Sequence, residues 1–410
     1  MSKNNENKLI PKLRFSEFEN DGEWKEGQLI DICEINPKVS RLPDEFVYID
    51  LESVDKGKLL QKKIINLEDA PSRAQRLLSD KDVIYQTVRP YQRNNYHFNK
   101  NDSFDYVAST GYAQLRAYKS SSFLYQLLHT DHFVSKVIKK CSGSNYPAIN
   151  STDLSQIQIE FPDNPTEQQK IAACLSSLDE VITAESQKLE LLKDHKKALL
   201  QNLLPQVGET VPKFRFKEFE DSGEWVEKKL GEVADFINGR AYKQQELLSE
   251  GRYRVLRVGN FFTNNEWYYS DLELDEDKYC DNGDLLYAWS ASFGPRIWIG
   301  EKVIYHYHIW KVKNKTGVNK KFLFNLLDFE TERMKSQMAN GFALLHITKG
   351  TIENWKSHIP VSEIEQAKIA DTLSSVDDLI NAQIEKVEAL QLYKKGLLQG
   401  LFPNVNEVTV

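Results

Sequence analysis

The sequence predicts a mixed α/β (α+β) fold with an internal pseudo-twofold repeat, in which two domains are separated by two long helices that form an antiparallel coiled coil. Three observations predict it. Residues 11–24 and 212–225 are identical at 10 of 14 positions. Residues 163–205 and 361–403 match at 21 of 43 positions. Residues 25–162 and 226–360, each about the size of one domain, do not match in any obvious way.

This pattern divides the chain into six segments. They are an N-terminal repeat motif (1–24), a first domain (25–162), a central helix (163–205), a linker with the second motif (206–225), a second domain (226–360), and a C-terminal helix with a tail (361–410). The repeated frame is kept while the two inserts differ. We therefore expect a fixed scaffold that presents two separately chosen surfaces.

Both repeated helices carry a heptad pattern of apolar residues about 38–40 residues long, which corresponds to a helix of ~58 Å. The predicted seam residues are Ile171, Leu175, Leu178, Ile182, Leu189 and Leu192 in the first helix, and Ile369, Leu373, Val376, Ile380, Val387 and Leu390 in the second. We favour pairing of the two helices within the chain. Core packing in an ordinary helix bundle and a coiled coil with a partner protein are the alternatives.

Polar residues interrupt the seam at matching places, Glu185 with Gln383 and Lys196 with Lys394, and are expected to set the register of the pair. Capping boxes are predicted at 166–169 and 362–365, and prolines stop both helices. The motif at 212–225 follows a helix, whereas its twin at 11–24 does not. We therefore expect residues 11–24 to dock after the end of the second long helix.

The two domains are expected to contain many short strands, for example at 83–88, 253–258, 284–289 and 303–312. A polar, aromatic and basic loop follows one strand in each domain. Arginine with asparagine or glutamine is the side-chain set that reads guanine and adenine edges, and aromatic rings stack on bases. The DNA-binding candidates in these loops are Arg89, Tyr91, Arg93, Asn94, Asn95, Trp289, Ser290, Ser292, Phe293 and Arg296. A solvated turn with a structural arginine is the alternative for each loop.

Further DNA-binding candidates lie elsewhere in the domains. Small polar segments late in each domain allow backbone N–H groups to approach phosphates, unless they are simple turns. A predicted alternating strand places two histidines on one face, where nucleic-acid contact is favoured over metal binding because no carboxylate or cysteine partner is visible. These candidates are Ser142, Ser144, Asn145, Tyr146, Asn340, His306 and His308, together with Lys62 and Lys63 in a basic stretch.

The net charge of −7 argues at first against a nucleic-acid partner. However, residues 25–162 hold 18 basic and 17 acidic residues, and residues 226–360 hold 19 and 18, so the acidity lies in the repeated frame. The stretch 56–100 has 10 basic and 4 acidic residues, and 296–321 has 7 and 1. By contrast, 266–284 has 8 acidic residues and one lysine and is expected to face away from DNA.

The sequence contains no motif for catalysis or for a cofactor. It has no P-loop, no GxGxxG segment and no amino-methyltransferase motif, and its four cysteines lack zinc-ligand spacing. We therefore predict no enzyme activity, no cofactor and no metal ion in this chain. With no signal peptide and no membrane-length apolar run, we expect a cytoplasmic protein with free thiols and no membrane contact.

The layout resembles the DNA-specificity subunit of type I restriction–modification systems over residues 11–403. The resemblance rests on EQQKIAACLSSLDEVI and EQAKIADTLSSVDDLI in the helices, preceded by PKLRFSEF and PKFRFKEF. It implies a non-catalytic subunit whose two target-recognition domains each read one half of a bipartite, asymmetric site in double-stranded DNA. The helices would act as a ruler that sets the gap.

The resemblance also implies partners. Modification (methyltransferase) subunits, expected to number two, would dock on this chain, and restriction endonuclease/translocase subunits would join through them. S-adenosylmethionine, ATP and Mg²⁺ would be bound by these partner subunits. The alternatives are the specificity subunit of a combined restriction–methylation system, an orphan subunit, a nuclease or methyltransferase that acts alone, and a coiled-coil scaffold for protein interactions.

Overall fold

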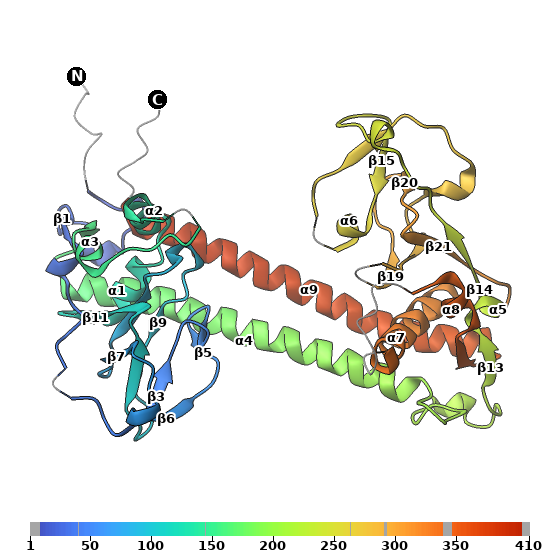
Figure 1. Cartoon of the computed structure of the whole chain (residues 1–410), viewed down its shortest axis with the longest axis horizontal. Helices are drawn as coiled ribbons and strands as arrows, with labels where there is room; N and C mark the ends of the chain where they lie inside the picture. Colours follow the sequence, from blue (N-terminus) through green and yellow to red (C-terminus); the bar gives the residue numbers. More distant parts are fainter. Residues whose placement is uncertain are drawn as a thin grey trace. The chain divides into compact units, whose positions relative to one another are not determined.

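The computed structural model describes residues 9–39, 41–143, 145–262, 264–290, 293–338 and 347–403. The chain divides into two compact units. Unit 1 comprises the chain up to Ser186 and from Glu385 onward, and unit 2 comprises Gln187–Ile384. Helices α4 (Pro165–Leu203) and α9 (Glu363–Leu401), green and red in Figure 1, each begin in one unit and end in the other.

The remaining helices and strands belong to the two variable domains. The first domain contains β1 (Lys25–Gln28), β2 (Cys33–Ile35), β3 (Glu45–Ile49), β4 (Val54–Asp55), β5 (Lys58–Leu59), β6 (Lys63–Asn66), β7 (Ala74–Leu77), β8 (Val83–Gln86), β9 (Tyr96–His97), β10 (Tyr106–Ser109), β11 (Tyr112–Ala117), α1 (Ser121–Leu127), α2 (Asp131–Lys140), α3 (Ser151–Ser155) and β12 (Gln158–Phe161). The second contains β13 (Val226–Lys229), α5 (Leu230–Val233), β14 (Ala234–Asn238), β15 (Tyr253–Leu256), α6 (Val258–Phe262), β16 (Tyr268–Ser270), β17 (Tyr279–Cys280), β18 (Leu285–Ala288), β19 (Gly294–Ile297), β20 (Val303–Tyr305), β21 (Ile309–Asn314), α7 (Lys320–Met338), α8 (Lys349–Asn354) and β22 (Lys356–Ile359).

The two domains have the same sheet topology, although their sequences do not match. One sheet has the order β6-β3-β10-β7 in the first domain and β16-β15-β20-β17 in the second. The other has the order β2-β11-β8-β9 and β14-β21-β18-β19. The pairs β3/β10 and β15/β20 are parallel, and the other pairs in these sheets are antiparallel. Interior strands such as β8 and β18 are buried along their whole length. Such strands require a run of mostly apolar residues but no particular residue at each position, so two domains with different sequences can share one fold.

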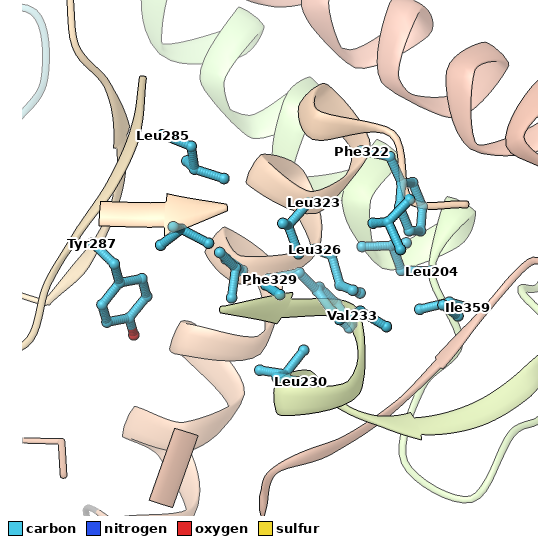
Figure 2. Close-up of a cluster of buried hydrophobic side chains, with 14 of the residues drawn as sticks. Leu204, Leu230, Val233, Leu285, Tyr287, Phe322, Leu323, Leu326, Phe329 and Ile359 are labelled. Atoms are coloured by element: carbon cyan, nitrogen blue, oxygen red, sulfur yellow. The ribbon is translucent and has the colours of Figure 1, made fainter. Parts of the chain in front are cut away.

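Each domain shares a hydrophobic core with the long helices of its own unit. In unit 2, residues of α5, β18 and α7 pack together, as Figure 2 shows for Leu230, Leu285 and Phe322. The same cluster includes Leu203 at the end of α4 and Leu373 near the start of α9. In unit 1 the corresponding cluster joins the first domain to the start of α4 and the end of α9. Each domain is therefore held by apolar packing against the helix pair.

All twelve predicted seam residues are buried or half-buried, whereas Leu191 and Leu392 on other faces are 68% and 71% exposed. In unit 1, Lys394 of α9 lies 2.6 Å from Asp179 of α4. In unit 2, Lys196 of α4 lies 2.7 Å from Asp377 of α9. These two ion pairs are equivalent in the repeat. They show antiparallel pairing within each unit and explain why the seam carries a lysine at both places.

The repeated motif docks against both long helices, as predicted for residues 11–24. The backbone N–H of Leu13 donates to the carbonyl of Gly400, 2.8 Å away near the end of α9. In unit 2 the N–H of Phe214 donates in the same way to Asn202 of α4, also at 2.8 Å. In each unit the motif thus lies against the last turn of one long helix, close to the first turn of the other.

The predicted capping boxes are partly wrong. The cap of α4 is Asn164 rather than Thr166, since the Asn164 Oδ1 accepts from the backbone N–H of Thr166 at 2.9 Å and a proline follows at the first helical position. Ser362 does cap α9, at 3.4 Å from the N–H of Glu365. The carboxylate of Glu365 does not reach back to this cap. It binds Arg215 and Trp225 of the repeated motif instead.

Candidate nucleic-acid interface

In the first domain the structure brings together two predicted DNA-binding segments. The loop after β8 contains a short 3-10 helix (Pro90–Gln92), and Ala148 forms β-bridges with Val88, just before this loop, and with Ser142. The Arg89 guanidinium lies 4.4 Å from the centre of the Tyr146 ring, and the Arg89 N–H donates to the carbonyl of Pro147 at 2.8 Å. Arg89 has a left-handed backbone (φ 54°), a conformation that costs about 1–3 kcal/mol for a residue other than glycine. The loop therefore holds Arg89 in a defined position.

We call this face the Arg89 surface, made of Arg89, Tyr91, Ser142, Asn145 and Tyr146. Tyr91 and Tyr146 are 51% and 63% exposed, and Ser142 and Asn145 are also exposed. Among the described residues, Arg89 forms no ion pair with a carboxylate. A guanidinium stacked on an exposed tyrosine and not neutralised by an acid remains able to donate to an acceptor-rich partner. Ser144, which was also predicted here, lies outside the described residues.

Other residues of the same loop are used inside the protein. Arg93 donates to the carbonyl of His129 at 3.0 Å and to Asp131 at 2.6 Å. Asn95 is 1% exposed, and its Oδ1 accepts from the backbone N–H of Gln86 at 2.9 Å. The prediction that Asn95 contacts DNA is wrong, because its amide group is buried and stabilises the loop. Arg93 fixes the loop to α2.

Three further candidates in the first domain differ in their surroundings. The Oδ1 of Asn94 accepts from the backbone N–H of Lys56 at 3.2 Å, which ties the loop to the β4–β5 hairpin. Lys62 pairs with Asp102 at 2.5 Å. Lys63 is exposed on the edge strand β6. Of these three candidates, Lys63 is the one that is exposed and forms no ion pair with another described residue.

In the second domain Trp289 anchors the loop that follows β18. Its backbone carbonyl accepts from Ile347 at 3.0 Å, and its indole N–H donates to the carbonyl of Tyr307 at 2.8 Å. The indole ring stacks on Trp310, with centroids 5.8 Å apart. Of the other loop candidates, Ser290 is half-buried, Phe293 packs against the core and Arg296 is exposed. Ser292 and Asn340 lie outside the described residues.

The predicted strand through His306 and His308 is wrong, because the chain turns there between β20 and β21. The N–H of Ile309 donates to the carbonyl of His306 at 2.9 Å, which closes the turn. The two imidazole rings nevertheless lie side by side, with centroids 4.8 Å apart. Burial, with help from His308 and Arg257, lowers the pKa of His306 to about 4, so its ring is neutral at pH 7. Among the described residues, no group of three or more potential metal ligands is present.

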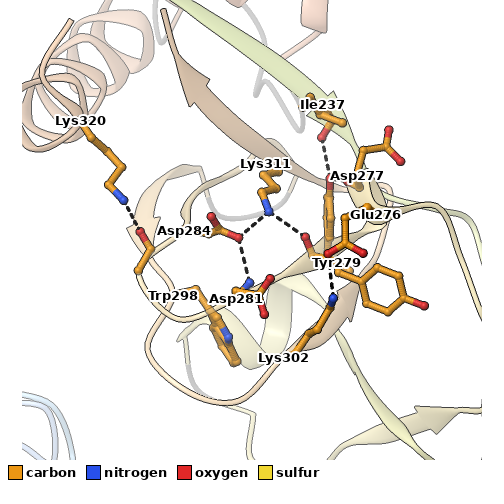
Figure 3. Close-up of polar contacts among 12 residues, drawn as sticks. Ile237, Glu276, Asp277, Tyr279, Asp281, Asp284, Trp298, Lys302, Lys311 and Lys320 are labelled. Atoms are coloured by element: carbon orange, nitrogen blue, oxygen red, sulfur yellow. Dashed lines mark hydrogen bonds and ion pairs between the residues drawn. The ribbon is translucent and has the colours of Figure 1, made fainter.

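Two acidic residues of the stretch 266–284 form ion pairs with lysines of their own domain. Lys311 bridges Asp284 at 2.5 Å and the carbonyl of Tyr279 at 3.0 Å, and Lys302 pairs with Glu276 at 2.8 Å (Figure 3). Both lysines belong to the basic stretch 296–321. Counting charges along the sequence therefore overestimates the positive surface of this domain, since part of that charge is used within it.

Each unit also contains a cavity beside the last turns of one long helix. The cavity in unit 1 has a volume of about 440 Å³, and that in unit 2 about 520 Å³. Five helix residues line the first and their five repeat equivalents line the second. They are Gln391, Lys394, Lys395, Leu398 and Gln399 in α9, and Lys193, Lys196, Lys197, Leu200 and Gln201 in α4. The duplication thus produces two similar lysine-rich recesses, one against α2 and one against α7.

Comparison with known proteins identifies similar chains. The family model described as "Type I restriction modification DNA specificity domain" matches residues 21–194 and 222–389. The specificity subunit of the type I restriction enzyme MjaVIII from Methanocaldococcus jannaschii is 28% identical over 300 residues, which cover 68% of each protein. The putative MjaX specificity subunit of the same organism is 29% identical over 306 residues, covering 70% of this chain and 69% of that protein.

Two solved structures share the fold. The type I restriction–modification S subunit from M. genitalium superposes with a TM-score of 0.60 at 16% identity, covering 97% of this chain and 100% of the other. A chain from a study of assembly and conformational transition of a type I system gives 0.58 at 22% identity, covering 93% and 98%. None of the helices in the described ranges is long and apolar enough to cross a membrane.

Proposed function

This chain belongs to the type I restriction modification DNA specificity family, and from that premise we propose that it is the DNA-recognition subunit of a type I restriction–modification complex. Each variable domain reads one half of a bipartite, asymmetric site in double-stranded DNA. The observation that carries the proposal is the repetition of one domain topology with different surface loops. Two domains that share a fold but differ in their surface loops can each recognise a different DNA sequence, as a site with two different halves requires.

The same proposal assigns catalysis to partners. This subunit is non-catalytic and acts in the cytoplasm. Two modification subunits methylate the DNA with S-adenosylmethionine, and endonuclease/translocase subunits use ATP and Mg²⁺. The two lysine-rich cavities support two equivalent partners, because the repeat places equivalent helix residues around one cavity in each unit and so gives the chain two similar docking surfaces.

Sequencing of methylated DNA tests the function directly. We expect cells that express this chain with its modification subunit to methylate one bipartite motif, with two specified half-sites around an unspecified gap. Cells with the modification subunit alone are the control and should lack the motif. Methylation of a short continuous motif, or no change on adding this chain, would refute the proposal.

Replacing Arg89 with alanine is expected to relax recognition of one half-site while leaving the other unchanged. A bidentate arginine–guanine contact contributes about 1–3 kcal/mol of discrimination, so DNA sites that carry a different base at that one position should also become methylated. Arg41→Ala is the matched control, since Arg41 belongs to the same domain and pairs with Asp44 on the exposed surface. An equal loss of binding on all DNA sequences would assign Arg89 to a phosphate instead.

A further inference from the structure

Arg257 of the second domain differs from the neighbouring arginines in its electrostatic surroundings. Arg240, Arg252, Arg254 and Arg333 each pair with a glutamate. Arg257 follows strand β15 and has no carboxylate partner among the described residues. Its Nε is buried and has no hydrogen-bond acceptor in the described structure.

An aromatic ring lies against this guanidinium. Its central carbon lies 4.2 Å from the centre of the Tyr268 ring. The backbone N–H of His306 donates to the carbonyl of Leu256, the residue before Arg257, at 2.9 Å, and the charge of Arg257 contributes to lowering the pKa of His306. The Tyr242 ring stacks on His306 with centroids 6.3 Å apart. The site therefore combines one unneutralised guanidinium with two tyrosines and a neutral imidazole.

This cluster is continuous with the loop that follows β18. His306 lies 4.8 Å from His308, and His308 lies 5.0 Å from Trp289, measured between ring centroids. Tyr307, at the tip of the same turn, is 38% exposed. The rings of Trp289, His308 and His306 therefore connect the loop after β18 to the side chains around Arg257.

The chemistry of the cluster favours a nucleobase over an isolated anion. Arginine stays charged, and Arg257 has no carboxylate partner among the described residues, so its guanidinium is stabilised by a ligand that supplies acceptors. Aromatic and imidazole rings recognise flat ligands by stacking. Guanine offers two acceptors, O6 and N7, at the spacing that an arginine fork fits.

We propose that Arg257, supported by His306, Tyr242 and Tyr268, is a specificity-determining residue of the second domain that binds a guanine of the target DNA. The inference rests on the proposed function and adds the base-reading group of the second half-site. It assigns this role to a residue outside the loops that the sequence singled out.

The test uses the complete complex of this chain with its modification subunits and reads out methylated motifs. Arg257→Ala should lower discrimination at one guanine position of one half-site by roughly 10- to 100-fold and leave the other half-site unchanged. Arg257→Lys keeps the charge but lacks the fork, so it should relax the same position. Arg254→Ala removes a nearby arginine that pairs with Glu301, and should leave the motif intact.

Three results would overturn the inference. They are an unchanged motif in Arg257→Ala, full discrimination in Arg257→Lys, and an equal loss of methylation at all sequences, which would indicate a phosphate contact. Failure of the proposed function is distinguishable, because the unaltered complex would then yield no bipartite motif at all. If the alanine variant does not fold, the lysine variant decides the question.

Discussion

Replacing Glu365 with alanine is expected to destabilise unit 2 by about 3–5 kcal/mol, because it leaves a buried cation without its partner. The Glu365 carboxylate is 1% exposed and binds Arg215 through both oxygens, at 2.7 and 2.9 Å. The same carboxylate accepts from the indole N–H of Trp225 at 3.1 Å. One side chain at the start of α9 thus binds two residues of the repeated motif, Arg215 near its beginning and Trp225 at its end.

Hydrogen exchange, read peptide by peptide, measures this effect best. Peptides of unit 2 should exchange faster in Glu365→Ala, while those of unit 1 serve as an internal reference. Glu363→Ala is the matched control, since Glu363 is exposed in the same first turn and contributes only about 0.3–1 kcal/mol through the helix dipole. Protection in Glu365→Ala equal to that of the control would show that the motif is held by apolar packing alone.

Unit 1 contains the same arrangement and predicts a symmetric result. Glu167 binds Arg14 through both oxygens at 2.8 Å and the indole of Trp24 at 3.2 Å. The sequence pointed to these glutamates but assigned them to helix caps. A capping pattern is local, whereas the partners that bind Glu167 and Glu365 lie about 150 residues earlier. The signal that was available is that all three residues recur together in both repeats.

The frame was predictable because its determinants are periodic or repeated. The heptad pattern identified the seam, and the order of the repeats predicted the docking of residues 11–24. The shared fold of the two domains was not predictable by matching residues, since it depends on which short apolar strands become neighbours. The turn at His306 was missed for a related reason, because an alternating pattern continues through it.

The reading surface was only partly predictable, because side-chain type does not show which partners a fold supplies. Arg89 and Arg93 stand in one loop, yet within the described part of the chain Arg93 has a carboxylate partner and Arg89 has none. Lys302 and Lys311 add to a basic stretch, yet acidic residues of the same domain neutralise them. Arg257 lies outside the predicted loops, and its lack of an acid partner becomes visible only when the strands are assembled.

Inserting four helix-forming residues after Ser186 of α4, together with four after Ile384 of α9, is expected to lengthen the unspecified gap of the target site without changing either half-site. Ser186 and Ile384 are the last residues of their units on the two helices, so the paired insertion lengthens both helices equally and leaves both hydrophobic cores intact. Four residues add ~6 Å of helix and rotate it ~40° beyond one full turn. One base pair adds ~3.4 Å and rotates the duplex by roughly 35°. The gap should therefore grow by one or two base pairs.

The matched control is a single four-residue insertion after Gly208, in the exposed loop between α4 and β13. Gly208 has a positive φ of 86°, and nothing lies within 4 Å of the position that a Cβ would take. The loop lies wholly within unit 2, so an insertion there adds residues without changing the length of α4. Its methylated motif should keep the original gap. Two results would show that the helices do not act as a ruler: altered half-sites in the complex with the helix insertion, or methylation of sites with the original gap. A rigid spacer changes the distance between the two recognition domains and leaves the recognition domains themselves unchanged.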